Sequence, residues 1–145
     1  MQELATVSMF LFQLCGVAAT DFAEDVVHAA KRYDLDPRLL VSMMRQESHC
    51  NPEATGALGE IGIMQLKRNT WATSGYNKLT DKQLRKPRIN IMLGARHIYR
   101  CLQKCGGSLA GALGLYSGLR KNKKTGQCRE NVKYGGAILA RIAES

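Results

Sequence analysis

The stretch at residues 36–48 reads Asp-Pro-Arg-Leu-Leu-Val-Ser-Met-Met-Arg-Gln-Glu-Ser and predicts an apolar helix. Asp36 is a good N-cap, and Pro37 suits the first helical position. One face of this helix is built at the spacing i, i+3, i+4, i+7 by Leu40, Met43, Met44 and Glu47. A carboxylate therefore lies on the stripe that should face the core.

Glu47 is consequently the first candidate catalytic residue. An ionised carboxylate on a core-facing stripe is costly unless it has a partner. Desolvation raises the pKa of a carboxyl group, and a carboxyl that stays protonated near neutral pH can serve as a general acid. The competing interpretation is a glutamate at a frayed helix end that turns out to water.

Several short motifs follow Glu47 in a fixed order. In chain order they are Ser48, Asn51-Pro52, Gly56, Gly59, Gly62-Ile63-Met64-Gln65, Pro87, Asn90-Ile91, Gly94, Gly107-Ser108-Leu109, Ala112-Leu113, Tyr116-Ser117-Gly118, and Glu130 with Tyr134. This order, above all the step of eighteen residues from Glu47 to Gln65, resembles the soluble lytic transglycosylase (SLT) family, relatives of goose-type lysozyme. The resemblance extends over roughly residues 23–143.

The resemblance implies a mainly α (α+β lysozyme-like) fold, with a single helical domain that carries a catalytic groove. It also implies cleavage of peptidoglycan with one catalytic glutamate and with no metal or cofactor. In this family's reaction Glu47 would protonate the glycosidic oxygen between N-acetylmuramic acid and N-acetylglucosamine. As a carboxylate it would then take the proton of the C6 hydroxyl, which closes a 1,6-anhydro ring.

The same resemblance assigns substrate-binding roles around the catalytic glutamate. Ser48 would help to hold the site together, and Gln65 would reach into the groove and hydrogen-bond sugar. Gly62 would let the chain come close to the substrate, while Ile63 and Met64 would help to form the wall of the groove.

Later motifs supply two tyrosines. Tyr116 would hydrogen-bond near Glu47, and Tyr134 matches the family's late tyrosine. Ser117 stands where the family more often has Asn, which puts that particular contact in doubt. For either tyrosine, the alternative is an amphipathic residue of the core.

Glu60 is the acidic residue nearest to Gly62 in the loop before it. Glycosidases that use water normally need two carboxylates across the scissile bond. We interpret Glu60 as loop surface or a sugar contact. The alternative is that Glu60 is the second carboxylate, a base that activates water, which would make the protein a muramidase on the same fold. A third hypothesis is a cell-wall-binding structural subunit with little turnover.

The composition limits the other function classes. The chain of 145 residues fits one domain and has a net charge of +9, which favours polyanions such as nucleic acid, anionic lipid or cell-wall polymers. The basic run at residues 120–124 is interpreted as a solvated loop. Because no aromatic platform and no basic recognition helix accompany it, we predict no nucleic-acid partner.

Five cysteines are present, and they form no CxxC pair, so a zinc site is not predicted. With Cys15 set aside, a Cys105–Cys128 disulfide is expected in an oxidising compartment. Cys101 and Cys105 share a helical face, which is a poor geometry for a disulfide. The alternative is a set of buried free thiols that act as small hydrophobes.

Residues 4–19 are mostly apolar but too few for a membrane span, which needs about 20 apolar residues. The segment lacks a basic n-region, although Val17-Ala18-Ala19 resembles a cleavage site. We expect residues 1–20 to form an extra, retained apolar helix that packs on the domain, a partner or a membrane. Residues 21–145 would form the lysozyme-like domain. A signal peptide is the alternative.

These observations set the expected partners and location. The expected partners are peptidoglycan glycan strands and, through residues 4–19, a larger phage assembly (tail or virion) or a secretion apparatus. The location is the periplasm or cell wall, reached by export or as part of a virion.

Local signals predict the remaining elements. Asp21 and Glu24 have capping-box spacing before a helix that reaches Tyr33, and a helical segment is expected from Met64 toward Trp71. Further signals are listed in chain order: a Thr80–Gln83 capping box, a long helix from Pro87 stopped by Gly106-Gly107, a helix capped by Ser108, a loop at residues 120–129, and a last helix with Val132, Ile138, Leu139 and Ile142.

Overall fold

The computed structural model describes residues 2–68, 70, 73, 75–76 and 78–145. These residues form seven α-helices and one 3-10 helix, which are α1 (Gln2–Cys15), η1 (Val17–Phe22), α2 (Ala23–Tyr33), α3 (Pro37–Ser48), α4 (Asp81–Leu84), α5 (Pro87–Lys104), α6 (Leu109–Tyr116) and α7 (Val132–Ala143). In the described ranges the only β pairing is two isolated bridges, Thr55–Ile61 and Ile61–Leu66. The prediction of a mainly helical chain is confirmed.

Helix α3 forms as its sequence predicts. The Asp36 side chain accepts the backbone N–H of Arg38 at 2.9 Å, and Pro37 occupies the first turn. Apolar residues 39–41 and 43–44 are all buried. The helix ends where His49 and Cys50 take left-handed backbone angles, with φ of 54° and 63°. That turn redirects the chain into a long loop directly after Glu47 and Ser48.

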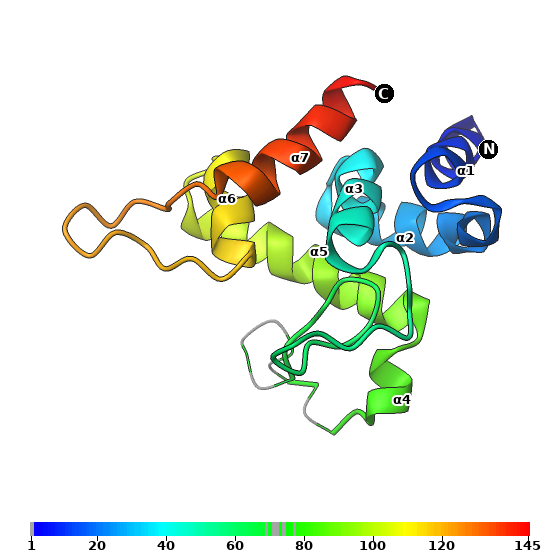
Figure 1. Cartoon of the computed structure of the whole chain (residues 1–145), viewed down its shortest axis with the longest axis horizontal. Helices are drawn as coiled ribbons and strands as arrows, with labels where there is room; N and C mark the ends of the chain where they lie inside the picture. The colour runs from blue at the N-terminus through cyan, green and yellow to red at the C-terminus, as the bar shows by residue number, and fades with distance from the viewer. Residues whose placement is uncertain (1, 69, 71–72, 74, 77) are drawn as a thin grey trace.

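The other helices surround α3 and α5 (Figure 1). Helix α3 contacts α1, α2 and α7, while α5 contacts α2 on one side and α6 on the other. The loops between α3 and α5 lie apart from α1 and α7, below α3 and α5 in the view of Figure 1. Glu47 therefore sits at the end of α3 where the helical part of the molecule meets these loops.

Helix α5 is the long helix expected from Pro87. Its buried face carries Asn90, Ile91, Ile98 and Cys101. Gly106 and Gly107 follow its last turn with φ of 62° and 87°, so the predicted stop is confirmed. The Thr80–Gln83 capping box, the Ser108 cap and the loop at residues 120–129 are confirmed as well.

The apolar N-terminal segment packs on the domain as helix α1. Its residues Val7, Phe10 and Leu11 are buried against η1, α2 and α3, while Met9 and Phe12 are exposed. None of the helices formed by the described residues is both long and apolar enough to cross a membrane.

Setting Cys15 aside was wrong, because a disulfide joins it to Cys50, with Cα atoms 5.7 Å apart. No local pattern indicates this pair, because the packing of α1 on α3 brings the two residues together. The Cys105–Cys128 disulfide is confirmed, and it ties the loop between α6 and α7 to the end of α5. Cys101 is a buried free thiol.

Two local predictions were wrong. The spacing of Asp21 and Glu24 forms no capping box, because η1 runs through Phe22 and leads directly into α2. Residues 64–68 are not helical: Gln65 has a left-handed φ of 52°, and Leu66 pairs back with Ile61. Trp71, the expected end of that helix, lies outside the described residues.

Candidate active site

Glu47 is held at the end of α3 by a tyrosine from α7. The Tyr134 hydroxyl donates a hydrogen bond of 2.6 Å to the Glu47 carboxyl atom Oε2. Burial raises the pKa of Glu47 to about 7; the Tyr134 hydrogen bond lowers it and the nearby charge of Glu60 raises it. A substantial fraction of this carboxyl is therefore protonated at neutral pH, as a general acid requires.

Tyr134 is placed by the start and the packing of α7. The Asn131 side chain accepts the backbone N–H of Tyr134 at 3.1 Å and caps the helix. Further along, the Arg141 guanidinium donates to the side-chain oxygen of Gln46 at 2.9 Å, which ties α7 to α3. The contact between Glu47 and Tyr134 thus follows from the packing of two whole helices.

Ser48 links the catalytic helix to the loop region. Its hydroxyl donates to the carbonyl of Ile63 at 2.8 Å and lies 3.3 Å from the carbonyl of Met44. The first contact spans fifteen residues and joins α3 to the turn at residues 61–66. The Ser48 hydroxyl therefore bonds beyond its own helix.

The turn at residues 61–66 is closed by two backbone hydrogen bonds between Ile61 and Leu66, of 2.8 and 2.9 Å. Gly62 has a φ of 81°, and a Cβ atom there would collide with the amide of Asn90. Gly62 is thus required both for the backbone angle and for the approach of Asn90. Gln65 takes its left-handed angle with a side chain present, a conformation that costs about 1 kcal/mol or more.

Asn90 anchors this turn from α5 and was not among the predicted site residues. Its side chain is fully buried, accepts the backbone N–H of Met64 at 2.8 Å, and donates to the carbonyls of Ile61 and Leu84 at 3.0 and 2.8 Å. The sequence analysis named Asn90 only as part of the Asn90-Ile91 motif. Its partner Met64 lies 26 residues away in the chain, and no local pattern predicts that contact.

Ile63 and Met64 contribute to the site through their backbone. Both side chains are fully buried and point into the core; the contribution to the groove wall expected of these two residues stays a prediction. Their carbonyl oxygens instead accept the hydroxyls of Ser48 and Tyr116, at 2.8 and 2.9 Å. The apolar side chains fix the turn, and the turn's carbonyls fix the neighbouring polar residues.

Tyr116 lies close to Glu47 and supports the site from α6. Its hydroxyl donates to the Met64 carbonyl, and its pKa is raised by burial and by the charge of Glu47. Ser117, which follows it, donates to the carbonyl of Gly114 at 2.7 Å and accepts from Asn131 at 3.1 Å. Ser117 therefore joins the end of α6 to the cap of α7.

The Gln65 side chain folds back on its own loop. Its amide nitrogen donates to the carbonyls of Gly62 and Ala54, at 3.0 and 3.3 Å. The sugar contact expected of Gln65 stays a prediction. Glu60 lies in the same loop, where its Oε1 accepts the backbone N–H of Leu58 at 2.7 Å.

His97 on α5 is a second residue that the sequence did not single out. Its ring lies 4.5 Å from the ring of Tyr116, and both line a cavity of about 170 Å³ that Gln65 also borders. Burial and nearby cations lower the pKa of His97 to about 4, so it is neutral at neutral pH. Only its proximity to Tyr116 in space identifies it.

The site offers one half-buried carboxyl with a raised pKa, next to phenol and hydroxyl groups that hold it in place. Within the described ranges, no three His, Cys, Asp or Glu residues gather as a metal centre requires. In this arrangement Glu47 can donate a proton to an oxygen atom of a bound substrate and can later accept a proton as a carboxylate.

This chain is similar to a known protein family and to individual known proteins. The family model described as "Transglycosylase SLT domain" matches residues 25–140. The membrane-bound lytic murein transglycosylase F 1 of Alkalilimnicola ehrlichii is 37% identical over 76 residues, 52% of this chain and 14% of that protein. The transglycosylase of Enterobacteria phage PRD1 is 33% identical over 88 residues, 61% of this chain and 31% of that protein.

The fold is also found among solved structures. An inactive mutant of lytic transglycosylase Slt from Pseudomonas aeruginosa matches with a TM-score of 0.67 at 17% identity, over 96% of this chain and 29% of that chain. This likeness confirms the predicted fold class. The chain spans less than a third of the length of each of these proteins.

Proposed function

The chain belongs to the transglycosylase SLT domain family, and on that basis we propose that it is a peptidoglycan lytic transglycosylase. Its substrate is the β-1,4 bond between N-acetylmuramic acid and N-acetylglucosamine, and its product ends in 1,6-anhydro-muramic acid. The observation that supports this most directly is the raised pKa of Glu47, about 7, beside the Tyr134 hydroxyl.

In the first step, protonated Glu47 donates its proton to the glycosidic oxygen, and the bond from that oxygen to the muramic C1 breaks. The Tyr134 hydroxyl donates to Oε2, so Oε1 is the atom that carries the proton in this step. The substrate's own N-acetyl group stabilises the positive charge that develops at C1. No second carboxylate is needed for this step.

In the second step, the Glu47 carboxylate takes the proton of the C6 hydroxyl while the C6 oxygen bonds to C1. The ring closes, Glu47 is protonated again, and water is not consumed. One group can act as acid and then as base because its pKa lies close to the working pH.

Mass spectrometry of muropeptides released from purified sacculi tests this proposal. We expect products with 1,6-anhydro-muramic ends, and no release by the Glu47→Gln variant. Clear activity in Glu47→Gln, with the variant folded by circular dichroism, would contradict the mechanism.

A muramidase reaction on the same fold is the second candidate, and Glu60 is the observation that favours it. Its charge acts on the pKa of Glu47, so the two carboxyls are near each other. Products with reducing ends, heavier by one water, would identify this reaction. Loss of those products in Glu60→Gln would then assign Glu60 as the base that activates water.

The location and assembly are part of the same proposal. Two disulfides suit an oxidising compartment, so we place the protein in the periplasm or at the cell wall. We further propose that residues 4–19 attach it to a phage or secretion assembly, since Met9 and Phe12 are 64% and 56% exposed. Co-purification with virions or secretion complexes tests this attachment. We expect the native protein to be retained in them and the Met9→Gln/Phe12→Gln variant to be lost from them.

A further inference from the structure

The loop between α6 and α7 concentrates positive charge. Six of the chain's 21 Lys and Arg residues lie at residues 120–133, in this loop and the first turn of α7, against one acidic residue, Glu130. All six are exposed: Arg120, Lys121, Lys123, Lys124, Arg129 and Lys133. In Figure 1 the loop, drawn in orange, extends away from the helices on the side opposite α1. None of the six residues takes part in the proposed mechanism.

These six cations are not neutralised by the protein itself. In the part of the chain that the structure describes, none of them forms an ion pair, not even with Glu130, and the pairs that do form involve other residues. A group of exposed charges of one sign raises the local concentration of ions of the opposite sign. The loop is therefore able to attract an anionic partner from outside the chain.

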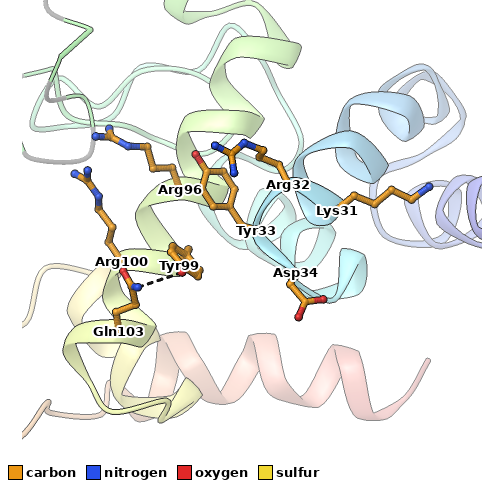
Figure 2. A pocket seen from close by; sticks show the side chains of 8 residues that line it. All are labelled: Lys31, Arg32, Tyr33, Asp34, Arg96, Tyr99, Arg100 and Gln103. Carbon is orange, nitrogen blue, oxygen red and sulfur yellow. Dashed lines mark hydrogen bonds between the residues drawn. The ribbon is translucent and has the colours of Figure 1, made fainter.

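The cations around the cavity between α2 and α5 differ in this respect (Figure 2). The Arg32 guanidinium lies over the Tyr33 ring, 5.2 Å from its centre. The Arg96 guanidinium lies over the Tyr76 ring, 5.4 Å from its centre. These contacts already engage the two guanidinium groups. The loop between α6 and α7 is thus the stronger candidate for binding an anion.

Hydrogen bonds hold the tip of this loop in a closed turn. The backbone N–H of Asn122 donates to the carbonyl of Gln127 at 2.8 Å, and the carbonyl of Asn122 accepts the N–H of Gly126 at 2.8 Å. The Asn122 side-chain oxygen also accepts the N–H groups of Lys124 and Thr125, at 2.8 and 3.1 Å. The lysines of the tip are therefore carried on an ordered turn, so less conformational entropy is lost when a partner binds.

The base of the loop is fixed to two helices. The Cys105–Cys128 disulfide joins it to the end of α5. On α6, a Cβ atom at Gly114 would collide with the carbonyl of Arg129, and one at Gly111 would lie 2.9 Å from the Cβ of Cys128. The two glycines lie on one face of α6 and let the returning backbone pass close to the helix. The basic tip thus projects from a rigid base.

The composition of the loop indicates the class of partner. Residues 117–133 contain no aromatic side chain, so the loop offers nothing on which a nucleic-acid base can stack. Three of its cations at the tip are lysines, whose compact, hydrated charges suit a broad anionic surface better than paired recognition of one group. Val132, 80% exposed, adds an apolar side chain at the end of the loop. Clusters of about four to eight Lys and Arg residues are typical of proteins that bind anionic lipids.

We propose that the loop between α6 and α7 is a docking surface for anionic phospholipid headgroups at a membrane. The tip lysines, Lys121, Lys123 and Lys124, lie against the headgroup phosphates, while the base stays fixed to α5 and α6. The attraction is electrostatic and acts at the surface of the bilayer. This inference does not rest on the proposed cleavage, because a lipid surface contains no glycan.

Co-sedimentation of the full chain with vesicles tests the proposal. One set of vesicles consists of phosphatidylcholine alone, and the other also contains phosphatidylglycerol. We expect the native protein to bind only the anionic vesicles and to be released as salt is raised, because salt screens exposed charges. Failure to bind the anionic vesicles at low salt, or equal binding to both sets, would overturn the proposal.

The loop is tested by Lys121→Gln/Lys123→Gln/Lys124→Gln. This variant should bind the anionic vesicles about a hundredfold more weakly, the product of three separate lysine contributions. The three side chains are exposed, and circular dichroism checks that the variant is folded. Unchanged binding by the folded variant would refute the docking surface.

The matched control is Lys78→Gln/Lys82→Gln/Lys86→Gln, which removes three exposed lysines from the region between α3 and α5. Its binding should fall by less than about threefold, because only the net charge of the whole chain changes in the same way. Equal losses in the two triple variants would overturn the proposal, since net charge and not the loop would then cause the binding.

NMR on the native protein locates the contact without any substitution. Vesicles with a spin label on the headgroup broaden the amide signals of residues that lie near the lipid surface. We expect the strongest broadening at residues 120–127 and none at residues 78–86. Broadening centred on Met9 and Phe12 would refute the loop as the docking surface. Tighter binding to double-stranded DNA than to anionic vesicles at physiological salt would replace the lipid with a nucleic acid as its partner.

Discussion

The helices and the loops at residues 50–86 both contribute to the candidate site, but they are held in different ways. Helices α3, α6 and α7 place Glu47, Tyr116 and Tyr134 by burying apolar faces in one shared core. The loops bury Ile63 and Met64 in the same core and add polar contacts, above all those of Asn90, Ser48 and the Arg85 guanidinium, which donates to the carbonyls of residues 53 and 54. Burial is the largest cause of the raised pKa of Glu47, the Tyr134 hydrogen bond from α7 lowers this pKa, and Glu60 from the loops raises it further.

The largest effect is expected from Glu47→Gln, which leaves both regions in place and removes only the acid. Activity should fall by a factor of about 10²–10⁴, the usual contribution of a general acid. Product release from sacculi measures it. A loss of only a few fold would mean that a group other than Glu47 donates the proton. The proton donor would then not belong to α3.

The Cys15–Cys50 disulfide joins α1 to the first residue of the loops, so its removal tests the junction of the two regions. Cys15→Ala/Cys50→Ala should lower the free energy of unfolding by about 3–4 kcal/mol, given a sequence separation of 35 residues. Urea denaturation gives this value. Hydrogen exchange should also show α1 opening.

Cys105→Ala/Cys128→Ala is the matched control, because it removes a bridge of similar span, 23 residues, far from α1. It should lower stability by a similar amount without exposing α1. If α1 exchanges equally fast in both variants, the helix does not depend on its bridge.

Asn90→Ala tests the loops alone. Three backbone groups lose their partner in a buried position, so we expect a loss of about 2–3 kcal/mol of stability and a lower kcat. Asn51→Ala, in the same region but exposed, should cost less than about 1 kcal/mol. Thermal unfolding and kinetics on sacculi distinguish the two. Equal effects of the two substitutions on stability and kcat would show that the loops do not depend on Asn90.

The smallest effect is a shift in the pH profile, and it compares one residue from each region. Tyr134→Phe removes a hydrogen bond that lowers the pKa of Glu47, so the alkaline limb of kcat/KM, near pH 7, should move up. Glu60→Gln removes a charge that raises this pKa, so the limb should move down. Shifts in the same direction would contradict this account of the electrostatics.

The helical region could be predicted because its signals are local. Asp36, Thr80 and Ser108 each cap the helix that follows, and the apolar spacing of residues 40–47 gave the correct face for Glu47. Asp21 shows the limit of such signals, since a 3-10 helix overrides its spacing.

The loop region could not be predicted in the same way. The turn at residues 61–66 owes its shape to Asn90 from a distant helix and to a left-handed Gln65, so its apolar residues looked helical in the sequence. The Cys15 disulfide and His97 were missed for the same reason, because their partners Cys50 and Tyr116 come from other parts of the chain.

The buried thiol of Cys101 has a consequence for how the chain oxidises. It lies four residues before Cys105, so in an unfolded chain it competes for the same partner, Cys128. Once α5 is packed, burial raises the pKa of Cys101 to about 12, which keeps it almost free of thiolate and unreactive toward exchange. Packing of α5 before oxidation therefore removes Cys101 from the competition for Cys128, and the core protects the correct pairing.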